Sequence, residues 1–569
     1  MILRSRFVAQ LAWALCISAL LTQPAAAFCG FYVSGADSKL YANATMVVLM
    51  RDGTKTVLSM QNNYDGPPEQ FALVIPVPTV LTQDMVKTLP RDVFARVDAL
   101  GAPRLVEYWE TDPCLPNFDK AASAGGGGRG GAFAARPGVQ VEASFAVGEY
   151  DIVILSANDS SSLAGWLTDN HYNIPSGASG VLEPYVASGT KFFVAKVDPA
   201  RVSFENGQAA LAPLRFHYDS QDFSLPIRLG LLNSRGQQDL IVNILAPDRY
   251  EVSNRSNVTI PTNIRVQDAV RDDFPGFYEA LFARVLEKNP NAVVTEYAWN
   301  WNSCDPCPPG MMITGQDLAT LGADVTRPAA VSGSGGGGSG GGTSGAGGRS
   351  GAGGTSGRGG SSAPAAPAAR SVNPGSLNYT LTRLHYRYVG QELSDDLVFE
   401  RAEPLLGGRG TPDRSGELSM DVSNSGSLNN FQGRYVILHP WSDAPKCQQP
   451  ERGYWGGPPS GSATNATQSA RNTALTGAAP KAAVLTALIA QSLTALEVTA
   501  DKPLDPLGKP LPADDGGTNE PDAGSPPSSA GDDGCGCNLA GARRTGSAAI
   551  WYGLAGALGL AWLRRRRVP

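Results

Sequence analysis

The sequence predicts an α+β protein dominated by antiparallel β-sheet, with a few packed helices and long low-complexity linkers. Apolar and β-branched segments of strand length outnumber the segments with helical periodicity. The connections between the strand-like segments vary in length, which fits an α+β domain. The 66 glycines and 42 prolines place much of the 569-residue chain outside any core.

The first predicted elements are strands. Residues 45–50 and 56–61 are apolar or β-branched, and Asp52-Gly53 between them tolerates the positive φ of a hairpin turn. Residues 71–78 form another apolar run, but Pro76 and Pro78 cannot donate to a strand ladder. We therefore expect this run at a strand end or at a sheet edge.

The clearest helix begins near Pro90, a residue that favours the first turn. It ends before Gly101 and Pro103, and a short strand is predicted over 105–109. The apolar stripe of this helix consists of Val93, Phe94, Val97 and Leu100. We expect that stripe to pack on the sheet.

Residues 141–301 have the densest pattern of folded structure. One helix, which Ser160 or Ser161 can cap, presents Leu163, Trp166 and Leu167 on one face. A second helix ends at Asn289-Pro290 and has the stripe Phe277, Leu281, Phe282 and Val285. The predicted strands are 150–155, 191–197, 214–218, 227–232, 240–245 and 293–299.

Composition divides the chain into segments. A β-rich domain is predicted over 28–330, with a flexible glycine-rich loop at 121–138, because that loop is too poor in apolar groups to offset its ordering entropy. Strands are predicted again over 379–388, 396–401 and 431–439. They lie in a segment (375–455) that is small for an independent core, so we expect it to dock on the first domain. The other segments are a disordered Gly/Ser linker (331–374), a low-complexity stalk (456–533) with a helix near 481–498, and a terminal segment (534–569).

The N-terminus has the features of a secretory signal peptide. Arg4 and Arg6 precede an apolar region, and three alanines that end at Ala27 suit a signal peptidase. Cleavage after Ala27 makes Phe28 the mature N-terminus and removes residues 1–27. The sequence therefore predicts export.

The C-terminal segment carries a second membrane signal. Cys535 and Cys537 precede an uncharged run over 548–563, which is slightly short of the ~20 residues that span a bilayer as an untilted helix. Positive charges hold the adjoining end of such a helix at the cytoplasmic face. These charges are Arg564, Arg565, Arg566 and Arg567.

This order of cysteines, apolar helix and arginines resembles the C-terminal sorting signal of myxobacterial surface proteins (MYXO-CTERM). The resemblance implies that a sorting protease cuts near the cysteines and that Cys535 or Cys537 carries a lipid or another anchor. The alternative is a permanent single-span anchor with two incidental cysteines. In both cases the membrane is a partner of this segment and the body faces outward.

Five cysteines lie in the exported body: Cys29, Cys114, Cys304, Cys307 and Cys447. Outside the cytoplasm they are expected to oxidise, which leaves one free thiol or one partner for another chain. Four paired cysteines allow three connectivities, and the sequence does not choose among them.

Several phrases resemble a family of exported bacterial proteins known as a domain of unknown function, number 2330. The likeness covers roughly 28–455 and implies one composite, cysteine-stapled domain outside the cytoplasm. It implies no reaction, because the family has no catalytic residues to carry over. The phrases are FCGFYV (28–33), FALVIPVP (71–78), PLRFHY (213–218), LPIRLG (225–230), CDPCP (304–308) and FQGRY (431–435).

Cys304-Asp305-Pro306-Cys307 is the sharpest candidate for chemistry, since a CxxC pair can act as a redox dithiol. Pro308-Pro309-Gly310 would break the helix that lowers the thiol pKa in thioredoxin-like sites, which favours a structural disulfide. A zinc site with Cys29 and Cys114 is the remaining alternative, and an oxidising compartment disfavours it.

Other chemistry finds little support. None of the four histidines has a metal-ligand spacing. His217 and Asp219 have the residue types of a hydrolase triad, but the GxSxG pattern that positions a serine nucleophile occurs only in the Gly/Ser linker, where no turn could be held. Trp299 and Trp301 are core residues or a sugar-stacking platform. We expect no metal, cofactor or catalytic set, and the net charge of −6 argues against nucleic acid.

The sequence thus predicts a noncatalytic, surface-displayed envelope protein that is anchored at its C-terminus and binds an extracellular ligand of unknown identity. The competing class is an exported enzyme. It would be a hydrolase assembled in three dimensions around His217 or His385, or a thiol-disulfide oxidoreductase that uses Cys304 and Cys307.

Overall fold

The computed structural model describes a body that lies within a compact unit ending at Leu511. The predicted signal peptide, the glycine-rich loop, the Gly/Ser linker and the terminal segment lie outside the described residues. The structure describes residues 31–34, 41–65, 71–114, 143–157, 159–170, 177–198, 200–205, 208–233, 237–307, 310–327, 378–389, 395–424, 426–456, 468–469, 482–490 and 492–498.

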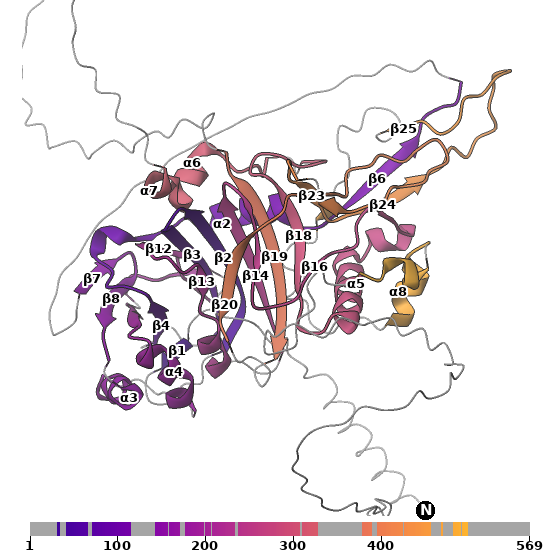
Figure 1. The fold of residues 1–569 in the computed structure, drawn as a ribbon. Helices are drawn as coiled ribbons and strands as arrows, with labels where there is room; N and C mark the ends of the chain where they lie inside the picture. Colours follow the sequence, from indigo (N-terminus) through magenta and orange to yellow (C-terminus); the bar gives the residue numbers. More distant parts are fainter. Residues whose placement is uncertain are drawn as a thin grey trace, which may run out of the picture. The chain divides into compact units, whose positions relative to one another are not determined.

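An 11-stranded sheet forms the centre of the body (Figure 1). Its predicted hairpin is confirmed, because β2 and β3 flank a turn in which Gly53 has a φ of +59°. β14 lies parallel to β2, and most other pairs are antiparallel. The order is β22 (Ser423–Asn424), β21 (Leu405–Gly407), β23 (Asn430–Gln432), β18 (Val293–Asn300), β19 (Thr380–Val389), β14 (Gln237–Ala246), β2 (Tyr41–Asp52), β3 (Lys55–Asp65), β12 (Leu214–Asp219) and β5 (Val86–Thr88), with β16 (Asn257–Thr259) on β18.

Both faces of this sheet are buried. Val47 and Leu49 of β2 pack toward the second sheet, whereas Val48 and Met50 pack against helix α2 (Arg91–Gly101). Burial on both faces explains why β2 is a continuous apolar run rather than an alternating one. The predicted stripe of α2 is confirmed as buried.

β19 is a central strand of this sheet although it follows the predicted linker. It pairs with β14 over ten residues on one side and with β18 on the other. The segment after the linker therefore completes the main sheet rather than resting on its surface.

A second sheet has the order β1 (Phe31–Ser34), β4 (Phe71–Val77), β9 (Lys191–Val197), β8 (Tyr150–Leu155) and β7 (Ala143–Val147). The run containing Pro76 is expected at a strand end or at a sheet edge. β4 pairs on both sides and is not an edge strand, but Pro76 is next to its last residue and Pro78 follows the strand, which confirms the strand-end alternative. β1 covers only residues 71–74 of β4, so Pro76 faces a partner strand on one side alone.

Two helices pack beside the second sheet (Figure 1), α3 (Ser160–Asp169) and α4 (Ala178–Ala187). Asp159, not a serine, caps α3 by accepting from the Ser162 amide. The strand predicted over 227–232 is wrong, since this segment is the 3-10 helix η2 (Arg228–Asn233). Its first amides donate to the carboxylate of Asp396 instead of to a strand.

A third sheet contains β24 (Arg434–His439) and β6 (Arg104–Glu110), which run parallel. The single strand predicted over 431–439 is divided at Gly433, whose amide donates to Glu296 and whose carbonyl accepts from Arg104. β23 thus belongs to the main sheet and β24 to the third. The remaining strands of this sheet are β17 (Ile264–Arg265), β25 (Trp455–Gly456) and β26 (Gln468–Ser469).

Helix α5 (Phe274–Lys288) packs between the main and third sheets and ends before Asn289, as predicted. The helix expected over 481–498 is two shorter pieces, α8 (Ala482–Leu488) and η7 (Leu493–Leu496). Leu485, Ile489 and Leu496 are buried in the apolar cluster around α5, so this region packs against the body.

Short elements complete the described body. A small three-stranded sheet has the order β13 (Ser224–Leu225), β20 (Leu397–Ala402) and β15 (Arg249–Val252), and a separate ribbon pairs β10 (Ser203–Glu205) with β11 (Gln208–Ala210). The other helical pieces are η1 (Gln83–Met85), η3 (Asp268–Arg271), α6 (Gly315–Leu318), η4 (Ala319–Ala323) and α7 (Asp324–Thr326).

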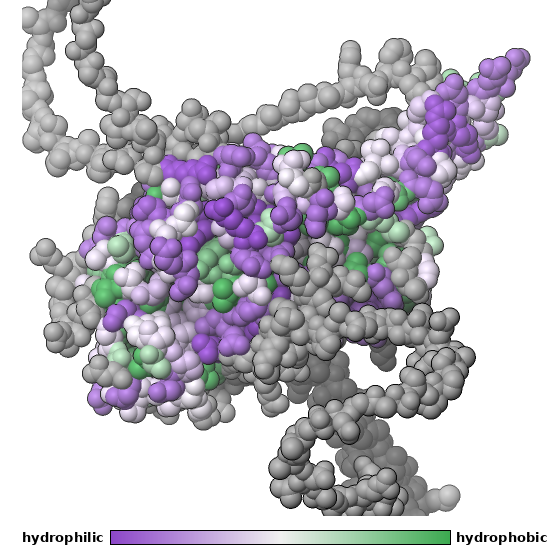
Figure 2. Space-filling view, viewed as in Figure 1, coloured by the Kyte–Doolittle hydropathy of each residue, from purple (hydrophilic) through white to green (hydrophobic). Residues whose placement is uncertain are grey.

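The body is thus the predicted α+β fold dominated by β-sheet. Within the described ranges no helix has both the length and the apolar character to cross a bilayer, and the predicted span over 548–563 lies outside them. Figure 2 shows that the arm formed by β6 and β24 is largely hydrophilic on its visible side.

Candidate functional site

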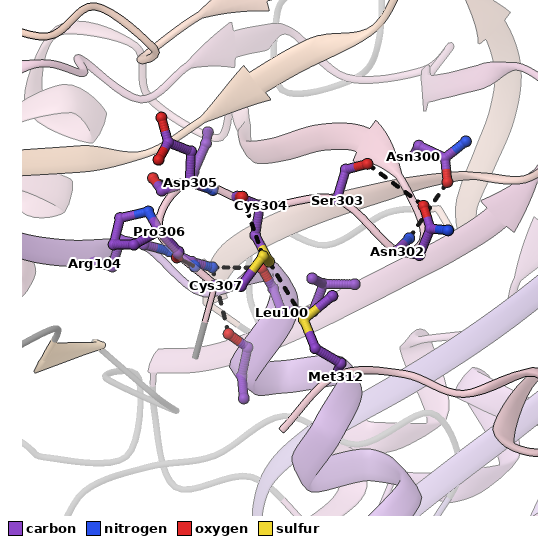
Figure 3. Close-up of a disulfide and its surroundings, with 12 residues drawn as sticks. Leu100, Arg104, Asn300, Asn302, Ser303, Cys304, Asp305, Pro306, Cys307 and Met312 are labelled. Atoms are coloured by element: carbon purple, nitrogen blue, oxygen red, sulfur yellow. Dashed lines mark hydrogen bonds between the residues drawn. A yellow bond between two sulfur atoms is a disulfide. The ribbon is translucent and has the colours of Figure 1, made fainter. Parts of the chain in front are cut away.

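The CxxC segment is a closed loop at the end of β18. Cys304 and Cys307 form a disulfide, as the sequence favours. The Cys304 Sγ contacts the Met312 Sδ at 3.4 Å, whereas Cys307 is exposed (Figure 3). We call residues 304–307 the cysteine loop. The zinc alternative loses Cys114, which forms its own disulfide with Cys447.

Arg104 ties the cysteine loop to the end of helix α2. Its Nη1 donates to the Pro306 carbonyl oxygen and its Nη2 to the Leu100 carbonyl oxygen, each at 2.5 Å. A cation at this end of a helix satisfies free carbonyls and complements the helix dipole. Burial lowers the pKa of Arg104 to about 10, although Tyr297 and Asp305 oppose that shift.

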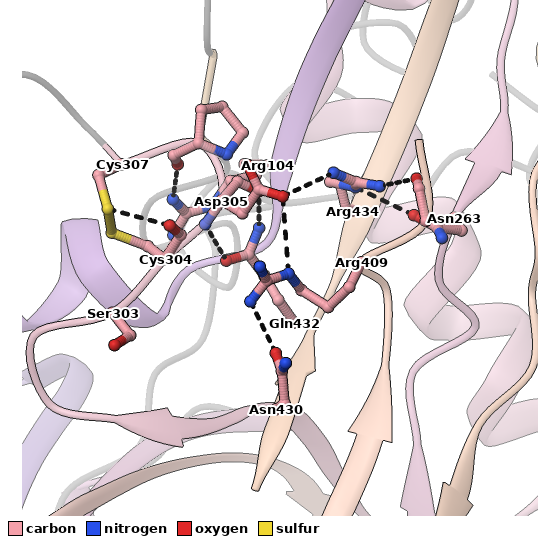
Figure 4. A network of polar contacts seen from close by, with 12 residues as sticks. Arg104, Asn263, Ser303, Cys304, Asp305, Cys307, Arg409, Asn430, Gln432 and Arg434 are labelled. Carbon is pink, nitrogen blue, oxygen red and sulfur yellow. Dashed lines mark hydrogen bonds and ion pairs between the residues drawn. A yellow bond between two sulfur atoms is a disulfide. The ribbon is translucent and has the colours of Figure 1, made fainter. Parts of the chain in front are cut away.

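Two more arginines approach Asp305, Arg434 from the start of β24 and Arg409 from the segment that follows β21 (Figure 4). The Asp305 Oδ2 lies 3.5 Å from the Arg434 Nη1 and 3.6 Å from the Arg409 Nε. Arg434 is fully buried, whereas Asp305 is 40% exposed and Arg409 is 28% exposed. Burial, together with the charge of Arg434, lowers the pKa of Arg409. We call Arg104, Arg409 and Arg434 the arginine cluster.

Polar and aromatic neighbours hold this arrangement in place. Gln432 pairs with the Asp305 backbone, donating to its carbonyl at 2.7 Å and accepting from its amide at 3.2 Å. The Arg409 guanidinium lies 3.6 Å from the centre of a Trp299 ring and donates to Asn430 at 2.7 Å. Trp299 therefore supports an arginine on one ring face, a role that the sequence alone does not suggest.

A second polar group, which we call the His385 cluster, is buried in the main sheet beneath α5. The two ring nitrogens of His385 lie 2.7 Å from Glu296 and 3.0 Å from Asp239. Phe282 stacks on the imidazole at 3.9 Å. Burial alone would lower the pKa of His385, but Glu296 and Asp239 outweigh it and raise that pKa.

Arginines complete the His385 cluster. Arg383 bridges Asp98 of α2 at 2.7 Å and Glu296 of β18 at 2.6 Å, and all three are buried. Arg387 pairs with Asp239 at 2.7 Å. Burial alone would raise the pKa of Glu296, but the charges of His385 and Arg383 hold it at about 2.

Sequence reasoning missed this cluster, although one signal was present. Arg383, His385 and Arg387 recur at every second position of a strand-like segment, so they share one face of β19. Three cationic groups on one face of an otherwise apolar strand indicate facing carboxylates.

The other predicted residues are separated in the structure. Asp219 accepts from Thr54 and Lys55 rather than from its strand neighbour His217. His439 lies 2.7 Å from Glu107 and stacks on Trp109.

The second disulfide, Cys114–Cys447, joins residues 333 positions apart beyond the ends of β6 and β24. The described structure thus selects one pairing of these four cysteines. The predicted cleavage and anchor residues lie outside the described residues. They are Ala27, Phe28, Cys29, Cys535, Cys537, Arg564, Arg565, Arg566 and Arg567.

Among the side chains that the structure describes, no group of three or more His, Cys, Asp or Glu residues is arranged to hold a metal ion. Charged and polar groups instead gather in the arginine cluster and in the His385 cluster.

Comparisons with known proteins give one match. No curated protein and no solved structure matches the chain. The model of a family described as an uncharacterized protein conserved in bacteria (DUF2330) matches residues 23–400, which include the cysteine loop, Arg104 and the His385 cluster. The match ends before β23, so FQGRY (431–435), which contains Gln432 and Arg434, lies beyond it. The chain belongs to this bacterial DUF2330 family.

Proposed function

We propose that this protein is exported, is anchored to the cell envelope through its C-terminus, and binds an extracellular ligand without catalysis. The observation that carries the proposal is that all four cysteines in the described residues form disulfides. Disulfides persist in oxidising compartments and are rare in the cytosol. The signal peptide predicted over 1–27 supplies the route to such a compartment.

The terminal segment supports the anchoring part of the proposal. Cys535 and Cys537, the apolar run and the four arginines follow one another in the order of a MYXO-CTERM signal. A sorting protease would then remove the apolar helix and leave a cysteine-linked anchor.

The geometry of His385 argues against a hydrolase built on it. Both ring nitrogens face carboxylates, and the side chain is only 1% exposed. A general base needs a ring nitrogen within reach of the nucleophile's proton. His385 has a structural role in this arrangement.

A redox role for the cysteine loop has one favourable feature, the exposure of Cys307. The described residues after the loop begin their next helix only at Gly315, so helix α6 does not start at a loop cysteine. Without such a helix terminus, one common means of lowering the thiol pKa is missing. We therefore favour a structural disulfide.

Mass spectrometry of the protein purified from native membranes tests the proposal. We expect Phe28 at the N-terminus, two intact disulfides, and a C-terminus near Cys535 or Cys537 with an added anchor mass. The double variant Cys535→Ser/Cys537→Ser should retain the terminal segment, whereas Ser528→Ala in the stalk should be processed normally. A cytosolic product that begins at Met1 with reduced thiols would overturn the proposal.

A further inference from the structure

The arginine cluster has more positive charge than the facing carboxylates balance. Three guanidinium groups surround the cysteine loop, and Asp305 is the carboxylate that the described structure places against them. A net excess of two positive charges follows, counting three arginines and one aspartate. Buried charges without counter-charges are costly.

The other partners of the two buried arginines are neutral. Arg434 donates to Asn263 at 3.0 Å, to the Tyr108 hydroxyl at 3.2 Å and to the Gly410 carbonyl. Arg104 donates to backbone carbonyl oxygens of α2 and of the cysteine loop. These contacts satisfy hydrogen bonds but leave the charges uncompensated.

Arg409 provides the accessible edge of the cluster. Its Nε is buried and has no hydrogen-bond acceptor among the described residues, because Asp305 lies at 3.6 Å. Trp299 holds the guanidinium plane from one side and Asn430 holds one terminal nitrogen. The guanidinium is therefore oriented, and its anionic partner Asp305 lies at ion-pair distance but beyond hydrogen-bond distance.

We propose that the arginine cluster is an oxyanion-binding site whose exposed residues are Asp305 and Arg409, and that it takes a carboxylate or phosphate group of a ligand. This deepens the proposed binding role and rests on it only for the extracellular source of the ligand.

Oxyanions fit this site better than other small ligands. The planar fork of arginine matches carboxylate and phosphate geometry, and such charge-assisted hydrogen bonds are strong. A simple cation would meet three like charges. Asp305 acts as an internal competitor, since its carboxylate lies at long distances from two guanidinium groups and is itself exposed.

The full chain titrated with inorganic phosphate or with acetate tests the site, with thermal unfolding and calorimetry as readouts. We expect at least one of the two ions to bind saturably in calorimetry and to raise the melting temperature with the same saturation, whereas chloride at equal ionic strength does neither. Nonspecific stabilisation by excluded anions such as phosphate is instead gradual and gives no saturable heat. Preference between the two probes identifies the ligand group as phosphate or carboxylate. The absence of saturable binding of either ion would overturn the proposal.

Two substitutions should change the affinity in opposite directions. Arg409→Gln removes one charged donor and should weaken phosphate binding about tenfold or more, since hydrogen bonds to charged groups contribute strongly. Asp305→Asn removes the internal competitor and should tighten binding severalfold. Arg401→Gln, at an arginine that is 70% exposed and pairs with Asp248, is the matched control and should leave binding unchanged.

The direction of the Asp305 effect separates binding from a purely structural role. If Asp305 only stabilised the fold, Asp305→Asn would lower the melting temperature without tightening phosphate binding, and the proposal would fail. These titrations use purified protein, so a failure to bind either ion would not argue against export and anchoring. In the same way, finding the protein in the cytosol would not argue against the oxyanion site.

Discussion

At the residue scale, the described body depends on charged side chains that are buried in the main sheet among apolar residues. Arg383 and His385 lie in the centre of the main sheet, and each is held by two carboxylates. Those carboxylates come from α2, β14 and β18, which lie far apart in the sequence. Replacing one member would leave the others buried without a counter-charge.

The contribution of His385 to the stability of the native protein should fall as the pH rises. Because its pKa is raised above 6.5 in the native state, the stability it contributes is fully present below pH 6.5 and is lost as the pH rises through the native pKa. His385→Gln should lose this alkaline dependence and cost about 3 to 5 kcal/mol near neutral pH, because buried carboxylates lose their partner. Urea unfolding at a series of pH values measures both effects.

His217 is the matched control for that experiment. Burial lowers its pKa, with Arg215 adding to the shift, so its neutral form is favoured in the native state. Its contribution is therefore lost as the pH falls below 6.5, which is the opposite direction. If His217→Gln abolished the alkaline dependence, or His385→Gln left it intact, the assignment to His385 would be wrong.

The sequence could predict some of these residues but not their partners. The CxxC spacing identified Cys304 and Cys307 as a pair because they are local. Arg104, Arg409 and Arg434 come from three separate segments, and their meeting at the cysteine loop depends on how the sheets assemble. Periodicity reports which face a residue occupies and does not report what it faces.

At the element scale, predictions succeeded where one segment forms one element. α2, α5 and the β2–β3 hairpin follow from local periodicity, a capping or terminating residue, and turn chemistry. The divided strand at Gly433 could not be predicted, because its two halves pair with different sheets. The same holds for η2, because the amides of Ile227 and Arg228 at its start donate to the remote Asp396.

Gly408, between β21 and the arginine cluster, should tolerate no side chain. Its φ is +72°, and an added Cβ would overlap the carbonyl oxygen of Gln432. Gln432 in turn holds Asp305, so Gly408→Ala should destabilise the protein by about 4 kcal/mol or more. Thermal or urea unfolding measures the loss.

Gly426 separates steric overlap from backbone strain in this test. Its φ is +68°, but an added Cβ would meet no atom within 4 Å among the described residues. Gly426→Ala should therefore cost only the left-handed strain, roughly 1 to 2 kcal/mol. Equal losses for the two variants would show that overlap with Gln432 is unimportant.

At the scale of the whole molecule, remote segments complete one another. β19 comes after the predicted linker and lies between β14 and β18, which both come before it. The Cys114–Cys447 disulfide adds a covalent connection between the same two parts of the chain. The linker is thus not needed to hold these parts together once the sheet has formed.

Cutting the linker should leave a folded body. A specific protease site placed near residue 350 should yield two fragments that remain joined on a non-reducing gel and separate on a reducing gel. In the Cys114→Ser/Cys447→Ser variant the cut fragments should still elute together from a native sizing column, because β19 is hydrogen-bonded on both edges and buried on both faces. The free energy of unfolding of that variant should be lower by about 2 to 5 kcal/mol, the usual contribution of a native disulfide. Separation of the fragments under native conditions would contradict the central position of β19, whereas co-elution would show that sheet pairing alone holds the body together.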